Sequence, residues 1–463
     1  MASTRRDFLR QAGCALVGGA AIASGVEQFG LINAIAQGSS AATDYKALVC
    51  IFLSGGNDGN NTVVPVDAEY ASYNSVRGAS GLAIAQASLL PVNPTSGRQF
   101  GFHPSMPELK TLFDNHQLAV VANVGPLVEP LTRATYQNGS GKRPYQLFSH
   151  SDQVAQWQTS VSSTATQTGW GGRTADRAAT LNGAATFPQV ISVAGTSIFA
   201  TGANTRPLGL PDSRTALSSA LPLTMSGTSA EVAARRSAYD QLRTLDLGAT
   251  LVKASRDVTE QAIQTSIALA SANTTLTTAF PDTTLGFQLE QVARLVKLRD
   301  TLSVKRQIFF CTLGGFDTHS GQTAANGQGA LLAQVSQAMK AFYDATVELG
   351  VQNSVTSFTL SDFGRTLQPA GTGAGVVGSD HGWGNHQFIL GGAVRGGDFY
   401  GRFPTLALGG PDDTDTRGRW IPTTSVEQYA ATLASWYGLT ASDIPLVFPL
   451  IGRFASANLG FMS

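Results

Sequence analysis

Acidic residues follow three apolar runs of the sequence, each near glycine. Asp58 follows LVCIFLSGGN, Asp317 follows IFFCTLGGF with His319 two residues further on, and Asp362 follows VTSFTLS. Carboxylates and imidazoles are ligands of zinc, manganese and similar ions, and glycine lets the backbone approach such a site closely. A single aspartate in a turn usually caps that turn. Its recurrence after three apolar runs instead indicates one shared metal site.

Four of the six histidines lie in loops that contain glycine or serine, namely His150, His319, His381 and His386. The last two share the stretch GSDHGWGNHQ (378–387), in which Asp380 precedes His381. His116 lies in DNHQ, which is typical of a surface turn. His103, in GFHP, either packs at the start of a helix or belongs to the site. The late histidines are therefore metal-ligand candidates as well.

The elements that must position these residues alternate between strand and helix. Apolar runs predict strands within 46–65, 118–124, 306–313 and 354–366, and the periodicity predicts helices within 103–115, 143–159, 230–300 and 329–349. Such alternation predicts an α/β fold with a mostly parallel sheet and helices on both faces. Ligands of such sheets bind beyond the carboxyl ends of the strands, where the three aspartates would meet.

Composition narrows the classes of function. Of the 463 residues 43% are hydrophobic and 13% are charged, and basic and acidic residues are equal in number. Bulk charge therefore recruits neither nucleic acid nor an anionic membrane surface. The sequence also lacks G-x-S-x-G, a phosphate-binding P-loop, H-E-x-x-H and Cys-x-x-Cys. We expect one domain over 37–463, with a loop-rich and helical insertion at about 160–285.

The N-terminal segment resembles a twin-arginine export signal. STRRDFLR (3–10) precedes the weakly apolar GCALVGGAAIASG, and AIA at 34–36 offers a cleavage site. This resemblance implies a signal peptide over 1–36, the export machinery as a partner, and a periplasmic or secreted protein without a transmembrane helix in its mature chain. Cys50 and Cys311 would then be either bridged between neighbouring strands or two buried thiols.

A set of ordered motifs resembles a bacterial, twin-arginine-exported family of unknown function that is related to the alkaline phosphatase and sulfatase superfamily. They are FLSGGNDGNNTVVP, HPSMPELKTLF, LFSHSDQVAQW, GWGGRTADR, LGGFDTHSGQ, LSDFGRT, DHGWGNHQFILGGAVRGGDFYG and TTSVEQYAATLASWYGL. The resemblance covers nearly all of the mature chain. It implies an alkaline phosphatase-like fold in which metal ions hold a phosphate or sulfate ester during attack by a serine, threonine or modified cysteine.

The same resemblance implies metal ligands at particular positions. Asp58 resembles the first-strand metal aspartate, and Asp317 and His319 resemble ligands of the other ion. Asp362 stands where the superfamily has the aspartate of an Asp-His pair, but Phe363 replaces the histidine. Either His381 or Asp380 then replaces the lost ligand, or the second ion is weak or absent. His386, or His381, resembles the late histidine that completes the first site.

The remaining implied roles concern the substrate. Ser149, in FSHSD at a predicted helix start, resembles the nucleophile, with Ser151 as the alternative helix cap. Asn57, Asn60 and Arg365 resemble contacts to substrate oxygens, although Arg365 could equally form an ordinary salt bridge. The predicted function is an exported hydrolase of a phosphate or sulfate ester, on a small ester or a decorated glycan. Its expected cofactors are one or two divalent ions, zinc, manganese, magnesium or calcium. The alternative, favoured by Phe363, is a non-catalytic, metal-stabilised binding or assembly protein of the same fold.

Overall fold

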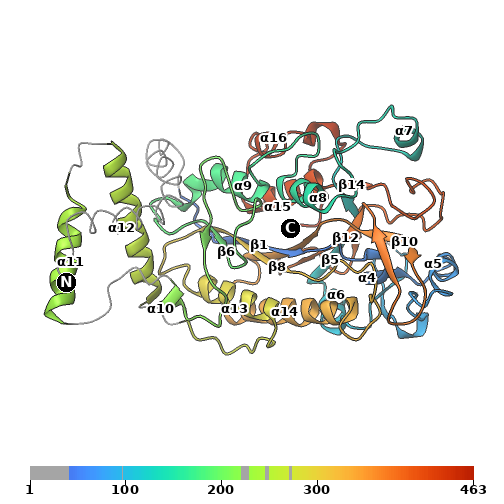
Figure 1. Ribbon diagram of the computed structural model, residues 1–463, viewed down its shortest axis with the longest axis horizontal. Helices are drawn as coiled ribbons and strands as arrows, with labels where there is room; N and C mark the ends of the chain where they lie inside the picture. Colours follow the sequence, from blue (N-terminus) through green and yellow to red (C-terminus); the bar gives the residue numbers. More distant parts are fainter. Residues whose placement is uncertain (1–40, 96, 221–228, 246–249, 271–273) are drawn as a thin grey trace, which may run out of the picture.

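The computed structural model describes residues 41–95, 97–220, 229–245, 250–270 and 274–463. At its centre lies a nine-stranded sheet in the order β13-β5-β12-β9-β1-β8-β6-β7, with β14 paired to β5 (Figure 1). The strands are β1 (Lys46–Leu53), β5 (Leu118–Gly125), β6 (Val190–Ser192), β7 (Leu208–Gly209), β8 (Arg306–Leu313), β9 (Val355–Ser361), β12 (Asn385–Leu390), β13 (Phe399–Tyr400) and β14 (Thr424–Ser425). The predicted signal peptide, 1–36, lies outside the described residues.

The sheet is mostly parallel, as predicted. β1 pairs in parallel with β8 and β9, and β6 pairs in parallel with β7 and β8. β12 runs antiparallel to both of its neighbours, β9 and β5. Its first residue, Asn385, pairs with Val124 near the end of β5, so the start of β12 lies at the edge where the parallel strands end. This edge carries the residues on which the sequence predictions depend.

Helices cover both faces of the sheet (Figure 1). One core cluster includes α6 (Pro107–Asp114), α13 (Thr284–Lys297) and α14 (Gln328–Glu348), and the other includes α8 (His150–Thr159), α9 (Trp170–Ala178), α15 (Val426–Tyr437) and α16 (Ile444–Val447). Because both faces are covered, seven of the eight residues of β1 are buried, which explains its continuous apolar sequence. The expected α/β class is confirmed.

Shorter elements surround the edge where the strands end. β2 (Val63–Pro65), β4 (Phe100–Phe102) and β3 (Leu90–Val92) form an antiparallel sheet, and β10 (Arg365–Ala370) pairs with β11 (Gly378–His381) in a hairpin. The short helices nearby are α4 (Gly59–Thr62), α5 (Tyr70–Arg77), η2 (Gln86–Ser88), α7 (Arg133–Gln137) and η4 (Ile451–Arg453). The β10-β11 hairpin carries His381 over the ends of β8 and β9.

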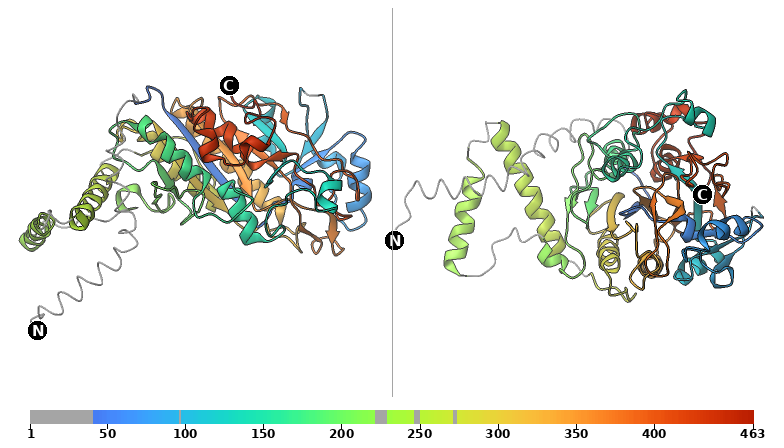
Figure 2. Two further views of the ribbon diagram at one scale, coloured as in Figure 1. Left: turned by 90° about the horizontal axis from the view of Figure 1, so that it is seen from above. Right: turned by 45° about the vertical axis from the view of Figure 1, so that its right-hand side comes forward.

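The segment predicted as an insertion, 160–285, has two kinds of structure. β6 and β7 extend the main sheet, with η3 (Ala179–Asn182) between α9 and β6. After α10 (Leu217–Ala220), the helices α11 (Ala230–Leu242) and α12 (Thr250–Ala270) stand beside the sheet as an arm (Figures 1 and 2). α11 has no buried residue. The site described below lies at the other end of the molecule from this arm.

Cys50 and Cys311 are free thiols. Cys50 of β1 is opposite Phe310, whereas Cys311 of β8 is opposite Ile51, so the two are offset by one residue. Successive side chains of a strand point to opposite faces, and Cys50 and Cys311 accordingly belong to different core clusters. This offset excludes the bridge that the sequence left open.

None of the described helices is both long and apolar enough to cross a bilayer.

Glu427, in the first turn of α15, is a buried acid whose carboxylate oxygens have no hydrogen-bond partner within the described residues. Burial raises the pKa of Glu427 to about 8. The nearby Ser425 and the residue's own backbone N–H oppose this rise, although neither forms a hydrogen bond of normal geometry with the carboxylate. The positive charges of Arg173 and Arg453 also oppose it. The folded state therefore holds a proton that the unfolded chain releases above its ordinary pKa of about 4.3.

This proton makes stability depend on pH. Stability falls as the pH rises from about 4.3 towards 8, because over that range the folded state binds more protons than the unfolded state. We predict that Glu427→Gln stabilises the protein at pH 7 by roughly 2–3 kcal/mol and flattens this slope. Urea unfolding at several pH values measures the effect. Glu231→Gln, on exposed α11, is the control and should change stability by less than about 0.5 kcal/mol. An unchanged pH slope in Glu427→Gln would contradict the prediction.

Candidate metal centre

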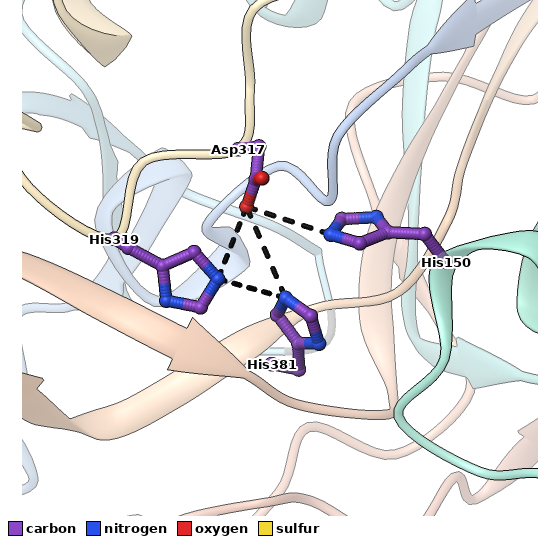
Figure 3. Close-up of side chains that lie close together, drawn as sticks. All are labelled: His150, Asp317, His319 and His381. Atoms are coloured by element: carbon purple, nitrogen blue, oxygen red, sulfur yellow. Dashed lines mark hydrogen bonds and ion pairs between the residues drawn. The ribbon is translucent and has the colours of Figure 1, made fainter.

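Four side chains from three parts of the chain converge at the edge where the strands end. His150 is the first residue of α8, Asp317 and His319 lie in the turn after β8, and His381 is the last residue of β11. Each offers one ligand atom, and the four atoms lie within 4.8 Å of one another. Figure 3 shows the three imidazoles directed at the Asp317 carboxylate. Three of the four residues were sequence candidates for metal binding.

The three imidazoles all present the Nε2 atom to the centre. Asp317 Oδ1 lies 3.5 Å from His150 Nε2, 3.2 Å from His319 Nε2 and 3.9 Å from His381 Nε2. His319 Nε2 and His381 Nε2 are 2.8 Å apart. The side chains of these residues are between 22% and 50% exposed, so solvent reaches the cluster.

The outer nitrogen of each imidazole is held by an oxygen acceptor. His150 Nδ1 lies 2.8 Å from Asp362 Oδ2, His319 Nδ1 lies 2.9 Å from Asp380 Oδ1, and His381 Nδ1 lies 2.7 Å from the Phe148 carbonyl oxygen. A carbonyl or an ionised carboxylate only accepts, so each Nδ1 carries the proton. In proteins, metal-bound histidines hold their outer N–H in this way.

In these tautomers none of the three Nε2 atoms carries a proton. Each Nε2 then points a lone pair at the centre, and the Asp317 carboxylate also only accepts. His150 Nε2 is buried and has no hydrogen-bond partner among the described residues. Acceptors gathered so closely repel one another unless a cation lies between them. The donor set therefore fits a divalent metal ion.

The charge states of Asp317 and His381 agree with metal binding. Partial burial alone would raise the pKa of Asp317, but the hydrogen bond and charge of Arg365 outweigh it and the pKa is lowered. Burial lowers the pKa of His381, which the neighbouring His150 and Arg365 lower further, against the Phe148 carbonyl. Asp317 is thus ionised and His381 neutral, as metal binding requires.

The apolar side chain of Phe363 packs against two imidazoles of the cluster. Its ring is fully buried, with centroids 4.7 Å from that of His150 and 4.6 Å from that of His381. Gly56 makes room for it, since a Cβ on Gly56 would lie 2.4 Å from the Phe363 ring. Where the resemblance implied a histidine, the structure thus has an aromatic ring packed against two imidazoles.

Asp58 lies apart from the cluster, in a buried ion pair with Arg77. Arg77 Nη1 is 2.6 Å from Asp58 Oδ2, and both side chains are fully buried. Gln322 Nε2 and the backbone and side-chain nitrogens of Asn60 also donate to this carboxylate. A guanidinium thus supplies the positive charge that the resemblance assigned to a metal ion. Nothing in the sequence identifies Arg77 as the partner of Asp58, because Arg77 lies in an ordinary amphipathic helix.

His386 also lies outside the cluster. Its Nδ1 accepts the Asn123 backbone N–H at 3.1 Å, and its ring stacks on Phe403 at 4.5 Å. Burial lowers the pKa of His386 to about 3, so the ring is neutral. Of the two late histidines left open by the sequence, the structure brings His381 to the cluster.

Asp362 and Asp380 contact the outer sides of the imidazoles rather than the centre. Burial raises the pKa of Asp362, although His150 and the Gly55 N–H oppose the rise. Partial burial likewise acts to raise the pKa of Asp380, but His319 and Arg417 outweigh it and lower the pKa. In this arrangement both carboxylates orient histidines.

The predicted substrate contacts are buried and bonded within the protein. Asn57 Oδ1 accepts from Gln328 Nε2, and Asn60 bonds to the Arg365 carbonyl and to Trp420. The Arg365 side chain is fully buried, and its guanidinium donates to Asp317 and to backbone carbonyls. No described donor of these three residues faces solvent. Arg365 instead orients the ligand Asp317.

Ser149 occupies the N-cap position of α8, next to the ligand His150, but its side chain caps no backbone N–H. Its hydroxyl donates to Asp152 Oδ2 at 2.6 Å and lies 3.1 Å from Ser151 Oγ. The sequence distinguishes His150 only as a histidine of a serine-containing loop, in FSHSD at a predicted helix start. The structure places it as the first residue of α8, after the left-handed Phe148 and the extended Ser149.

We predict that the protein binds one divalent ion per chain through this cluster. His150→Ala and His381→Ala should lose the ion, because each removes one of four donors. His386→Gln should keep it, since that ring lies outside the cluster. Elemental analysis of the purified variants, with thermal unfolding to check folding, measures this. Retention of the ion by a folded His150→Ala/His381→Ala double variant would place the metal elsewhere.

Comparison with solved structures gives matches of low similarity. The PsFucS1 sulfatase from Pseudoalteromonas sp. is 10% identical, with a TM-score of 0.31, over 83% of this chain and 71% of its own. The C-terminal periplasmic domain of EcEptC from Escherichia coli, in complex with Zn, is 9% identical, with a TM-score of 0.33, over 87% and 85%. Alkaline phosphatase from the Antarctic bacterium TAB5 is 10% identical, with a TM-score of 0.27, over 89% and 99%. At these values neither activity nor ligands transfer to this chain.

No curated protein sequence matches the chain. A family model does match, over residues 45–416, and its description is "Protein of unknown function (DUF1501)". The matched region contains all four residues of the metal cluster and both of the outer carboxylates, Asp362 and Asp380. Because the match spans most of the chain, this protein belongs to the DUF1501 family.

Proposed function

We propose that the protein is an exported, metal-dependent hydrolase of phosphate or sulfate esters. One observation carries the proposal: three Nε2 atoms and one carboxylate oxygen, Asp317 Oδ1, converge at a solvent-accessible point, where Arg365 Nη2 is the donor that reaches the oxygen and His150 Nε2 has no hydrogen-bond partner among the described residues. Such a centre binds a divalent ion, and its exposure leaves room for a substrate. Magnesium and calcium prefer oxygen ligands, so three imidazoles favour zinc, or next manganese, among the ions considered.

A bound divalent ion supplies Lewis-acid stabilisation of the negative charge that develops on a phosphoryl or sulfuryl group. The residues of the chain then provide orientation. Asp362, Asp380 and the Phe148 carbonyl fix the imidazoles, and Arg365 fixes Asp317. These contacts hold the ligand atoms in the orientation that an ion requires, which lowers the cost of binding it.

Ser149 is the proposed nucleophile. Two facts support this role: it is adjacent in the chain to the ligand His150, and its hydroxyl already donates to the Asp152 carboxylate. Asp152 is thereby placed to accept the hydroxyl proton as the serine oxygen bonds to phosphorus or sulfur and the bond to the alcohol oxygen breaks. The alcohol takes a proton and leaves, and water then hydrolyses the serine ester to regenerate Ser149. The N-terminus of α8 adds a favourable dipole for a developing anion.

A second function has its own support. Three histidines and one aspartate are enough to fill a tetrahedral zinc site, and closed sites of that kind are structural, whereas catalytic sites keep a position open. The buried Phe363 beneath two of the ligands adds apolar packing to such a site. This alternative is a metal-stabilised binding or assembly protein, in which metal removal lowers stability and no ester is turned over.

Turnover of aryl phosphate and aryl sulfate esters separates the two functions. We predict metal-dependent hydrolysis by the wild type, its loss in His150→Ala, and a fall in kcat of at least roughly a hundredfold in Ser149→Ala. Ser151→Ala is the matched control, because Ser151 Oγ contacts the same Asp152 at a longer 3.3 Å. Metal-loaded, folded protein without turnover would favour the structural function. Full activity in Ser149→Ala would leave a metal-activated water as the nucleophile.

Export belongs to the same proposal. It rests on Arg5 and Arg6 in the predicted signal segment, 1–36. We predict that Arg5→Lys/Arg6→Lys leaves the protein in the cytoplasm as the uncleaved chain, because the twin-arginine machinery recognises these two residues. Cell fractionation with immunoblotting measures the distribution. Normal export of the double variant would show that another pathway carries the protein.

A further inference from the structure

Residues 409–420, here called the aspartate loop, are organised around one buried carboxylate. Asp413 is fully buried, and its two oxygens accept backbone N–H groups from Gly409, Asp415, Gly418 and Arg419. A backbone bridge between Asp413 and Trp420 closes the loop. Four N–H donors on one carboxylate hold the backbone in a defined shape before any ligand arrives. The loop is therefore a preformed support for its own side chains.

Two arginines of the aspartate loop reach the metal centre from outside. Arg417 donates through Nη2 to Asp380, which holds the ligand His319. Arg419 donates through Nε to the backbone carbonyl of the ligand His381 at 3.0 Å, and its guanidinium lies 4.3 Å from the centroid of the Phe148 ring. Arg417 is thus one residue removed from the candidate ligand His319, whereas Arg419 bonds directly to the backbone of the candidate ligand His381.

These guanidiniums have donors to spare. Within the described residues, Arg417 Nε and Nη1 and Arg419 Nη2 have no hydrogen-bond partner. The two side chains are 37% and 19% exposed, so solvent reaches them. These unbonded N–H groups can donate to the oxygen atoms of a bound anion.

The carboxylates around the centre have partners within the protein. Asp317 pairs with Arg365, Asp380 with Arg417 and Asp415 with Arg419, while Asp362 holds His150. Guanidiniums match the oxygen geometry of phosphate and sulfate. Arg365 is fully buried and bonded, which leaves Arg417 and Arg419 for this contact.

We propose that Arg417 and Arg419 form an anion-binding rim beside the metal centre and determine the selectivity of the site for phosphate-like or sulfate-like groups. This inference rests on the proposed function and deepens it by assigning substrate recognition to the aspartate loop. Neither arginine was a candidate substrate contact in the sequence, because an Arg-x-Arg pair in a polar stretch is typical of a solvent-exposed loop.

Calorimetric titration with inorganic phosphate and with inorganic sulfate tests the rim, on metal-free and on zinc-loaded full-length mature protein. We expect the wild type to bind one anion, and Arg417→Gln and Arg419→Gln each to weaken that binding about tenfold, the effect of losing a charge-assisted hydrogen bond. Arg417→Lys should recover part of the loss because it keeps the charge. Arg402→Gln is the matched control, because Arg402 pairs with Asp412 of the same loop and is 61% exposed.

Zinc content and thermal unfolding are measured on the same samples. Unchanged zinc content with weaker anion binding supports the rim. Anion affinity equal to wild type in the Arg417→Gln/Arg419→Gln double variant overturns it, as does a wild type that binds neither anion in either form. Loss of zinc with unaltered anion binding also overturns it, since the arginines would then only position the histidines.

The outcomes separate this inference from the proposed function. Arginine-dependent phosphate binding in a protein that takes up no metal contradicts the hydrolase and supports the rim. Ester hydrolysis with the KM unchanged in both arginine variants supports the hydrolase and contradicts the rim.

Discussion

The candidate site depends on one buried guanidinium. Arg365, at the start of β10, donates to the carbonyls of Gly55 and Gly56 after β1, to that of Phe316 after β8, and to that of Ser379 in β11. The same group donates to Asp317. A planar guanidinium with five N–H donors can join several carbonyls that a lysine could not. Arg365 therefore joins the turns after β1 and β8 to β11, and so holds together the segments that carry Asp317, His319 and His381. Among the described residues, the candidate ligand Asp317 is the one carboxylate that this buried guanidinium contacts.

A second buried guanidinium, that of Arg77, occupies the position where the sequence predicted a metal ion at Asp58. Within the part of the chain that the structure describes, one cluster of potential metal ligands forms as a result, instead of two. Arg77 pairs with Asp58 in a fully buried contact, and Gln322 occupies the same carboxylate. Removing either partner would leave an uncompensated buried charge, so the pair is strongly held. Phe363 meanwhile packs against both His150 and His381. Among the described residues, a single group of potential metal ligands remains.

The outer contacts of the three imidazoles differ from one another. His150 is held by the buried Asp362, His319 by the more exposed Asp380, and His381 by the Phe148 carbonyl. A carboxylate makes an imidazole a stronger metal ligand than a carbonyl does. The aspartate loop acts on the last two contacts through its arginines, so it bears on both the geometry and the charge of the centre. The geometry of the cluster thus depends on residues beyond its four members, including Arg417 and Arg419.

Sequence alone determined the sheet and the location of the site. Continuous apolar runs can only be buried between two layers of helices, and parallel strands end at one edge, so Asp317, Asp362 and His319 had to lie near each other. Tertiary structure decided which of them point inward. Whether a carboxylate meets a metal, an imidazole or a guanidinium depends on contacts across hundreds of residues, such as Asp362 with His150 and Arg365 with Asp317. Local patterns carry no information about such pairings, because side-chain direction at a strand end is set by the turns that pack around it.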